Sequence, residues 1–191
     1  MPEYRRYFVP GGTYFFTIVT YRRRRLFADE ANLERLRSAL REVKAEMPFH
    51  IQAAVVLPDH MHFIWTLPPG DDQYSKRIGL MKVKFTLSLR GRNALPDNVS
   101  PSRRKHRESD VWQRRFWEHT IDEEDEFESY FDYIHYNPVK HRYVSCPHKW
   151  RPSSFHRWVR AGVYENTWAC CCGKRKPAAL DFSDIQDNTG E

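Results

Sequence analysis

Two apolar runs separated by a two-residue turn do most to constrain the fold of this chain. Residues 49–57 (FHIQAAVVL) and 60–67 (HMHFIWTL) are rich in β-branched and aromatic side chains, and only Pro58 and Asp59 lie between them. Because this pair favours a turn, the two runs predict an antiparallel hairpin. The second strand begins with His60-Met61-His62. Residues two apart in a strand point to the same face, so both imidazoles can reach one metal ion.

The segments around this hairpin alternate between strand and helix patterns. Residues 13–20 form a β-branched and aromatic run that predicts a strand. Residues 33–47 carry apolar side chains three and four apart, which predicts a helix ended by Pro48. The same pattern at residues 74–90 predicts a second helix, ended by Gly91.

The second half of the chain continues this alternation. Residues 91–110 have no apolar period and predict a mobile basic loop, and residues 111–120 predict a last strand with a bend at 113–115. An acidic first turn and an apolar face predict a helix from Asp122 that Pro138 ends near Asn137. The order β-α-β-β-α-β followed by a helix predicts an α+β, ferredoxin-like sheet with its helices on one face, then a catalytic helix and a C-terminal extension.

Length and charge indicate the class of partner. A chain of 191 residues suits one compact domain with appendages. Its 31 Lys and Arg against 25 Asp and Glu give a net charge of +6, which favours a polyanionic partner but does not choose between nucleic acid and an anionic membrane. No apolar run approaches the roughly 18–20 residues that span a bilayer, and residues 1–10 lack a signal-peptide core. We therefore expect a cytoplasmic protein.

A tyrosine and an asparagine one helical turn apart complement the histidine pair. Tyr133 and Asn137 share one face of the predicted last helix. An HxH pair alone is more often part of the alternation of polar side chains along a strand than a catalytic site. A tyrosine beside an asparagine at the end of a helix is as often a core residue as a catalytic one. Together, two imidazoles, a carboxamide and a phenol predict a metal-dependent site that cleaves phosphodiesters.

The residue types define the expected chemistry. His60, His62 and the Asn137 oxygen could hold Mg²⁺ or Mn²⁺, which would bind the scissile phosphate and stabilise the charge that develops there. Tyr133 would attack phosphorus and form a covalent phosphotyrosine, so the bond is exchanged and the cut can be rejoined. Tyr130, Tyr136 and Tyr143 have no metal-binding side chain one turn further along a helix.

Four cysteines remain without an assigned role. Cys146 stands alone, and residues 170–172 are consecutive cysteines without the CxxC spacing typical of a zinc site. We interpret them as incidental. Residues 169–191 end in polar and acidic residues and predict a disordered tail.

Longer motifs resemble the HUH single-strand endonucleases, and within them the REP-associated tyrosine transposases, relatives of the single-tyrosine insertion-sequence transposases. The resemblance covers roughly residues 4–168. It is carried by residues 4–7 (YRRY), 11–17 (GGTYFFT), 57–62 (LPDHMH), 111–119 (VWQRRFWEH), 132–141 (DYIHYNPVKH) and 150–157 (WRPSSFHR). Arg142-Tyr143 departs from the family pattern, which often has glycine and an aliphatic residue there.

The resemblance implies a function and a partner. It implies that His60, His62 and Asn137 hold a divalent metal, that Tyr133 is the nucleophile, and that single-stranded DNA is cleaved beside REP-type palindromic hairpins through a 5′-phosphotyrosine. It further implies a bacterial, nucleoid-associated monomer that acts in cis, whereas insertion-sequence relatives exchange helices as dimers; the sequence does not decide between these states. We expect a catalytic domain at residues 1–145, a DNA-binding extension at 146–168 and a tail at 169–191.

Basic and aromatic residues could contact the DNA. Basic side chains neutralise phosphates, and aromatic rings can stack on unpaired bases. The candidates are Arg22, Arg23, Lys82, Lys84, Arg114, Arg115, Lys140, Trp150 and Trp158, with Arg5, Arg6 and Tyr7 as candidates for reading a short single-stranded tag. Two other functions remain open: a hairpin-binding protein whose catalysis is unused, and a metal-dependent hydrolase that uses water while Tyr133 only packs.

Overall fold

The computed structural model describes residues 8–91, 100–101, 105, 110–172, 180–186 and 189–190. The candidates Arg5, Arg6 and Tyr7 and most of the predicted loop at 91–110 lie outside these residues.

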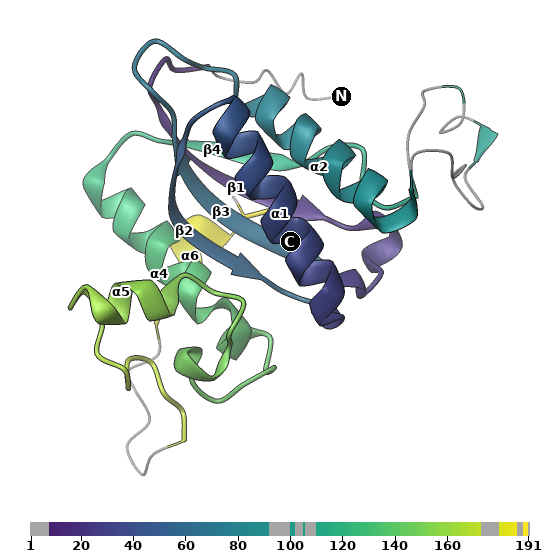
Figure 1. Cartoon of the computed structure of the whole chain (residues 1–191). Coiled ribbons are helices and arrows are strands. Elements are labelled where there is room, and N and C mark those ends of the chain that lie inside the picture. Colours follow the sequence, from purple (N-terminus) through teal and green to yellow (C-terminus); the bar gives the residue numbers. More distant parts are fainter. Residues whose placement is uncertain are drawn as a thin grey trace.

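A four-stranded antiparallel sheet forms the centre of the protein (Figure 1). Its strands are β1 (Thr13–Val19), β2 (His50–Val56), β3 (His60–Thr66) and β4 (Trp117–Ile121), in the order β2-β3-β1-β4. β2 and β3 form the predicted hairpin, and β1 pairs with β3 and β4. The prediction of a ferredoxin-like α+β sheet is confirmed.

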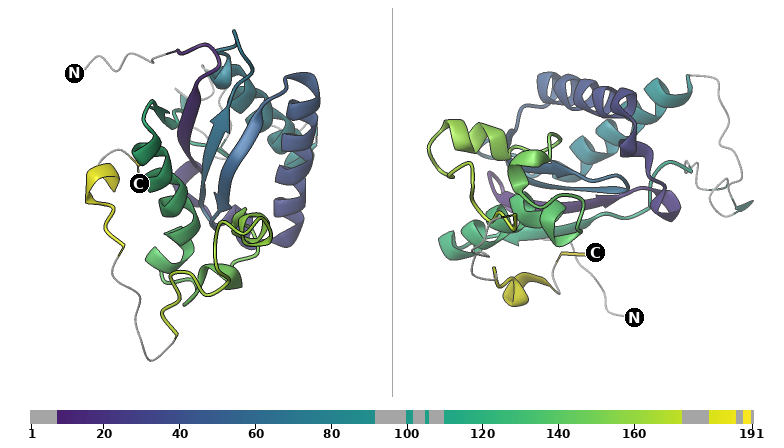
Figure 2. Two further views of the ribbon diagram at one scale, coloured as in Figure 1. Left: turned by 90° about the vertical axis from the view of Figure 1, so that its left-hand side faces the viewer. Right: turned by 90° about the horizontal axis from the view of Figure 1, so that it is seen from below.

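Helices cover both faces of this sheet (Figure 2). α1 (Glu30–Glu46) and α2 (Tyr74–Arg90) lie on one face, and α4 (Glu124–Lys140) lies on the other. Because side chains alternate along β3, Met61, Phe63 and Trp65 enter the core under α1 and α2. Ile64 enters the second core, under α4, and His60 and His62 share its face.

Two predicted boundaries are wrong. The strand predicted at residues 111–120 is a strand only from Trp117, and Trp112 makes an isolated bridge with Thr20. α4 does not end before Pro138 but continues to Lys140. Proline lacks only one N–H donor, and the last turn still closes because the His141 amide donates to the Asn137 carbonyl at 3.0 Å.

The C-terminal extension covers the outer edge of β2. It contains the 3₁₀ turn η3 (Pro147–Lys149) and α5 (Phe155–Arg160). The Ser154 amide donates to the Ala54 carbonyl at 2.8 Å, and the Ala54 amide donates to the Ser154 hydroxyl at 2.8 Å. These bonds occupy backbone groups that an edge strand otherwise leaves open to pairing with another chain.

The described parts of the tail pack against α4. α6 (Ser183–Gln186) lies beyond that helix in Figure 2. Ile185 is buried, and the ring of Phe182 lies 5.4 Å from that of Tyr133. The structure therefore corrects the prediction of a disordered tail for residues 180–186, because two apolar side chains in a polar segment find partners on α4.

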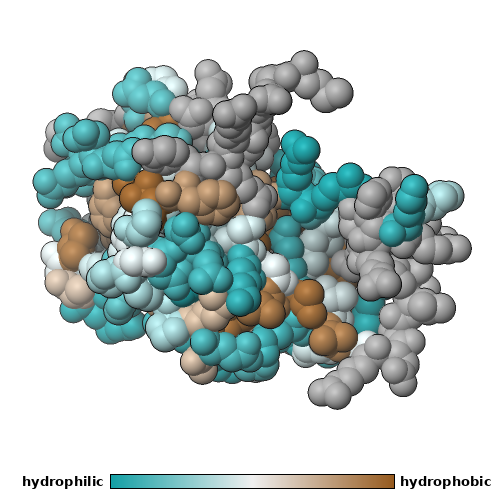
Figure 3. Space-filling model, turned by 90° about the horizontal axis from the view of Figure 1, so that it is seen from above, coloured by the Kyte–Doolittle hydropathy of each residue, from teal (hydrophilic) through white to brown (hydrophobic). Residues whose placement is uncertain are grey.

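No helix among the residues that the structure describes is long and apolar enough to cross a membrane. The face seen from above in Figure 3 is mainly hydrophilic, with hydrophobic residues in small groups.

Candidate active site

The two histidines open the central strand β3 beneath α4. His62 lies opposite Thr17 of β1 and Val55 of β2, and His60 lies opposite Val19. His60 is 1% exposed and His62 is fully buried, and their ring centroids are 5.1 Å apart. The structure therefore holds both imidazoles close together on the same face of the sheet.

α4 places the tyrosine against this pair. The Tyr133 ring lies 5.6 Å from the His62 ring, edge to face. Two turns later, the His141 ring lies 5.3 Å from the His60 ring. Asn137 is midway between Tyr133 and His141 in the chain, on the helix face that contacts the histidine pair, and it is fully buried.

Both histidines are oriented by hydrogen bonds at Nδ1. Asp59 Oδ1 lies 2.7 Å from Nδ1 of His60, and Thr17 Oγ1 lies 2.8 Å from Nδ1 of His62. Thr17 donates its single hydroxyl proton to the Thr189 carbonyl, so its oxygen accepts from His62. In neutral rings these contacts place the proton on Nδ1 and leave a lone pair on Nε2, the arrangement that a metal-binding histidine needs.

Asp59 is ionised next to His60. Burial opposes the charge, but the hydrogen bond from His60, together with the Arg23 guanidinium, outweighs burial and holds the pKa of Asp59 below its usual value. The Arg23 guanidinium lies 3.4 Å from the other Asp59 oxygen. A carboxylate behind a metal-binding histidine raises the basicity of the ring.

Lys140 contacts the proposed nucleophile directly. Its Nζ donates to the Tyr133 hydroxyl at 2.8 Å and lies 4.6 Å from the centre of the ring. Sequence analysis selected Lys140 only as a DNA-binding residue. An ammonium group at this position stabilises negative charge on the phenol oxygen or on an attacked phosphate.

The described tail covers the site from outside. Tyr133 is fully buried, and the Phe182 ring packs on it edge to face. The carbonyl of Thr189 accepts from Thr17, which in turn supports His62. In this conformation Tyr133 is therefore closed off from solvent.

The other tyrosines considered lie elsewhere. Tyr130 stacks on Phe15, and burial raises its pKa. Tyr136 faces Phe182, and Tyr143 stacks on Trp150. Among the tyrosines of the described chain that sequence analysis compared, Tyr133 is the one whose ring packs on the histidine pair.

A buried polar network joins α4 to the C-terminal extension. His135 is within hydrogen-bonding distance of the Ser154 hydroxyl (2.8 Å, Nε2) and the Tyr164 hydroxyl (3.2 Å, Nδ1), and Tyr164 donates to Asp132 at 2.5 Å. Burial lowers the pKa of His135 to about 3. The ring is neutral, and the network fixes the helix that carries Tyr133 and Asn137 to α5.

The predicted DNA-binding residues are spread over several surfaces. Arg22, Arg23, Arg114 and Arg115 are exposed. Lys82 donates to the Gln113 carbonyl at 3.2 Å, and Lys84 pairs with Glu42 and Glu46.

The two predicted stacking tryptophans pack against the protein. Trp150 and Trp158 each donate to a backbone carbonyl of β2, those of Val56 and Gln52, and pack against the second core. Base stacking by these rings and DNA contacts by the basic residues stay predictions.

Sequence analysis missed four residues at the site: Thr17, Asp59, His141 and Phe182. The spacing of four from Tyr133 to Asn137 continues to His141 and was a usable signal. Asp59 directly precedes His60, but its role depends on the turn geometry. Thr17 and Phe182 reach the site from distant segments, so no local pattern identifies them.

Comparisons with known proteins show which family this chain resembles. The sequence model of the family described as "Transposase IS200 like" matches residues 9–137. A REP-associated tyrosine transposase of Escherichia coli is 43% identical over 169 residues, which are 88% of this chain and 92% of that protein. A Haemophilus influenzae protein, provisionally given the same name, is 42% identical over 168 residues, 88% of this chain and 93% of its own length.

A solved structure is also similar. It is described as the REP-associated tyrosine transposase bound to a REP hairpin, and it matches with a TM-score of 0.75 and 40% identity over 93% of this chain and 100% of that one. The sheet, the histidine pair beneath α4 and these relatives lead to one conclusion: the chain belongs to the IS200-like transposase family, among the REP-associated tyrosine transposases.

Proposed function

We propose that this protein is a metal-dependent single-stranded DNA endonuclease and strand transferase that acts at REP-type palindromic hairpins through a 5′-phosphotyrosine intermediate. The observation that carries the proposal is the position of Tyr133, 5.6 Å from His62 and one turn before Asn137, in a chain of this family.

The buried donors fit a divalent cation. His60, His62 and Asn137 supply two imidazoles and one carboxamide oxygen, and His141 adds a third ring one turn further along. This mixed nitrogen and oxygen set suits an exchangeable cation, Mg²⁺ or Mn²⁺, better than tightly retained zinc. When bound, the cation would polarise the scissile phosphate.

The chain's own residues perform the remaining steps. The Tyr133 oxygen forms a bond to phosphorus while the bond from phosphorus to the 3′ oxygen breaks. The phenol proton passes to solvent water, and the departing oxygen takes up a proton from solvent water to become a 3′ hydroxyl. Lys140 stabilises the negative charge near Tyr133. Because the phosphodiester energy is conserved in the tyrosine ester, a 3′ hydroxyl can reverse the step and rejoin a strand.

The partner follows from charge and similarity. The chain carries a net charge of +6, and the similar solved structure is described as bound to a REP hairpin. Exposed Arg22, Arg23, Arg114 and Arg115 are the described candidates for phosphate contacts. The extension at 146–168 is proposed to contribute further contacts.

The site is complete within one chain, which supports a monomer that acts in cis. α4 packs on β2 and β3 of its own chain, and Tyr133 faces His62 of that same chain. Mixing Tyr133→Phe with His60→Ala protein tests this arrangement. We expect no cleavage by the mixture, whereas dimers with exchanged helices would rebuild one intact site and recover activity.

One observation favours a second function, hairpin binding without cleavage. Tyr133 is fully buried beneath Phe182, so the described conformation does not expose the nucleophile. A protein kept in this state would bind hairpins for regulation or genome organisation.

The deciding experiment incubates the protein with Mn²⁺ or Mg²⁺ and single-stranded DNA that carries a REP hairpin from the source genome. The DNA is labelled at the 5′ end in one sample and the 3′ end in another. Denaturing gels report cleavage and covalent adduct, and hairpin binding is measured in parallel. We expect an adduct that retains the 3′ label, as a 5′-phosphotyrosine requires.

Tyr136→Phe is the matched control for Tyr133→Phe, because both tyrosines lie on α4 against Phe182. The adduct should persist in the control and disappear in Tyr133→Phe and His60→Ala. If DNA is cleaved without forming an adduct, and this cleavage persists in Tyr133→Phe, the protein is a hydrolase. Binding without cleavage by the unmodified protein would support the binding function.

A further inference from the structure

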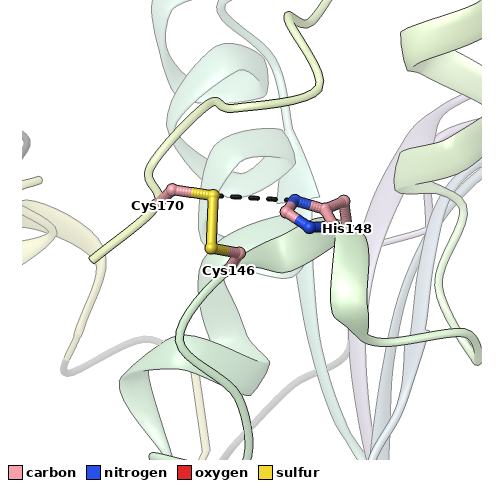
Figure 4. Close-up of side chains that lie close together, drawn as sticks. All are labelled: Cys146, His148 and Cys170. Carbon is pink, nitrogen blue, oxygen red and sulfur yellow. Dashed lines mark hydrogen bonds between the residues drawn. A yellow bond between two sulfur atoms is a disulfide. The ribbon is translucent and has the colours of Figure 1, made fainter. Parts of the chain in front are cut away.

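Three cysteines and a histidine meet beside the end of α4. Cys146 caps η3 and His148 lies within it, and Cys170 comes from the segment that follows α5 (Figure 4). Cys172 belongs to the same returning segment. Cys146 and Cys170 are joined as a disulfide. The Cys172 sulfur lies 3.0 Å from that of Cys146, and the Cys170 sulfur lies 3.6 Å from Nδ1 of His148.

Backbone contacts hold the two segments in this arrangement. The Lys149 amide donates to the Cys146 carbonyl at 3.1 Å, which closes the turn between Cys146 and His148. The Cys171 amide donates to the Ser145 carbonyl at 2.8 Å, which joins the returning segment to the first. Cys146 is fully buried, so one side of the cluster is shielded from water.

Cys171 lies between two members of the cluster but has other contacts. Its thiol lies near the Ala169 carbonyl and contacts Tyr136. Burial raises the pKa of the Tyr136 phenol, and the Cys171 thiol raises it further. Cys170 and Cys172, two residues apart, instead both contact residues of η3 or its cap. The consecutive cysteines are thus divided into two that face the cluster and one that does not.

We propose that in the reduced protein Cys146, His148, Cys170 and Cys172 bind one Zn²⁺. Three thiolates and one imidazole are a common donor set for structural zinc, which is four-coordinate and tetrahedral. Standard zinc–sulfur and zinc–nitrogen bonds at a tetrahedral angle place sulfur and nitrogen about 3.6 Å apart, as Cys170 and His148 are.

Formation of this site requires reduction of the disulfide, loss of the thiol protons and a change of partner for His148. A dithiol reductant supplies two electrons and two protons to the Cys146–Cys170 disulfide and is itself oxidised to a disulfide. The thiols release their protons as zinc binds. Coordination through Nδ1 of His148 replaces its 3.0 Å contact with the Asn166 carbonyl.

The position of the site indicates its effect. The zinc ion would connect residues 170–172 to the chain just beyond α4. It would thereby stabilise the extension against the helix that carries Tyr133, independently of any chemistry at Tyr133.

The test is a Co²⁺ titration of the full chain after reduction with a dithiol and removal of the reductant without air. Thiolate-to-cobalt charge transfer absorbs in the near ultraviolet, and tetrahedral cobalt has intense visible bands. The donors around His60 and His62 include no cysteine, so the charge-transfer band reports the cysteine cluster even if the proposed DNA chemistry is wrong. We expect the charge-transfer band to reach its full intensity with one cobalt ion per cysteine cluster and to disappear when one equivalent of Zn²⁺ displaces that ion.

Variants assign the ligands. Cys172→Ser changes an exposed residue and should preserve the fold, which circular dichroism checks. We expect it and His148→Ala to weaken cobalt binding at least about tenfold, and Cys171→Ser, the matched control, to leave binding unchanged. Failure of the reduced chain to develop the charge-transfer band, or equal loss in Cys171→Ser and Cys172→Ser, would overturn the proposal.

Discussion

The Lys140 ammonium group donates a hydrogen bond to the Tyr133 hydroxyl at 2.8 Å and lies over the same ring. Both residues belong to α4, so helical geometry maintains this contact. A cation beside the attacking oxygen stabilises the charge that develops as the phosphodiester is exchanged. In the proposed reaction Lys140 would therefore act at the attacking oxygen, a role that differs from the general phosphate contact that sequence analysis assigned to it.

Replacing Lys140 with methionine should slow formation of the covalent adduct by about 100-fold, because a preorganised charge is lost from the reacting centre. Hairpin affinity should change only a few-fold, because one phosphate contact at most is removed. Single-turnover kinetics and equilibrium binding separate the two effects. Lys76→Met, an exposed lysine on α2, is the control. Equal losses of rate and affinity would assign Lys140 to DNA binding alone.

Asp59→Asn should raise the Mn²⁺ concentration needed for cleavage by about 10- to 100-fold, because the carboxylate fixes the tautomer and the basicity of His60. The measurement is the Mn²⁺ concentration that gives half-maximal cleavage. Arg23→Gln is the matched control, since it removes the 3.4 Å ion pair but leaves the carboxylate. If Arg23→Gln reproduces the Asp59→Asn defect, the turn rather than the His60 contact is responsible.

Removing residues 180–191 should increase the rate of adduct formation, because Tyr133 is fully buried and Phe182 packs on its ring. The increase should be several-fold and should be reproduced in part by Phe182→Ala. Asp181→Asn, which leaves the aromatic contact in place, serves as the control. An unchanged or lower rate in the shortened protein, with hairpin binding intact, would show that the tail does not limit access.

Protonation of His135 should reduce stability at low pH. The folded protein keeps this ring neutral down to about pH 3, whereas the unfolded chain takes up the proton near pH 6.5. Between these values the unfolded state binds more protons, so the contribution of His135 is complete above pH 6.5 and is lost progressively toward pH 3. The loss amounts to a few kcal/mol.

Urea unfolding at several pH values checks this expectation. His135→Gln should be less stable at pH 7 but should show a shallower decline between pH 6.5 and pH 3. His50→Gln, at an exposed histidine, should follow the unmodified protein. A parallel decline in all three proteins would assign the acid sensitivity to other groups.

Local sequence patterns were sufficient for the order of the elements and for the centre of the site. Period-two and period-3.6 apolar patterns depend on neighbours in the chain, and the hairpin, α1 and α2 follow them closely. His60 and His62 share a strand face, and Tyr133 and Asn137 share a helix face, for the same reason. Pro138 is the local exception. Its missing N–H donor costs little because it lies in the last turn of α4, where the His141 amide still donates to the Asn137 carbonyl.

Tertiary structure alone brought distant segments together. Thr17 supports His62 across β1 and β3, and Phe182 covers Tyr133 from a segment of polar composition. Cys146 and Cys172 meet although 26 residues separate them. Such contacts depend on how the sheet, α4 and the extension pack. Residues that are far apart in the sequence and meet only after packing produce no periodic pattern from which the contact could be predicted.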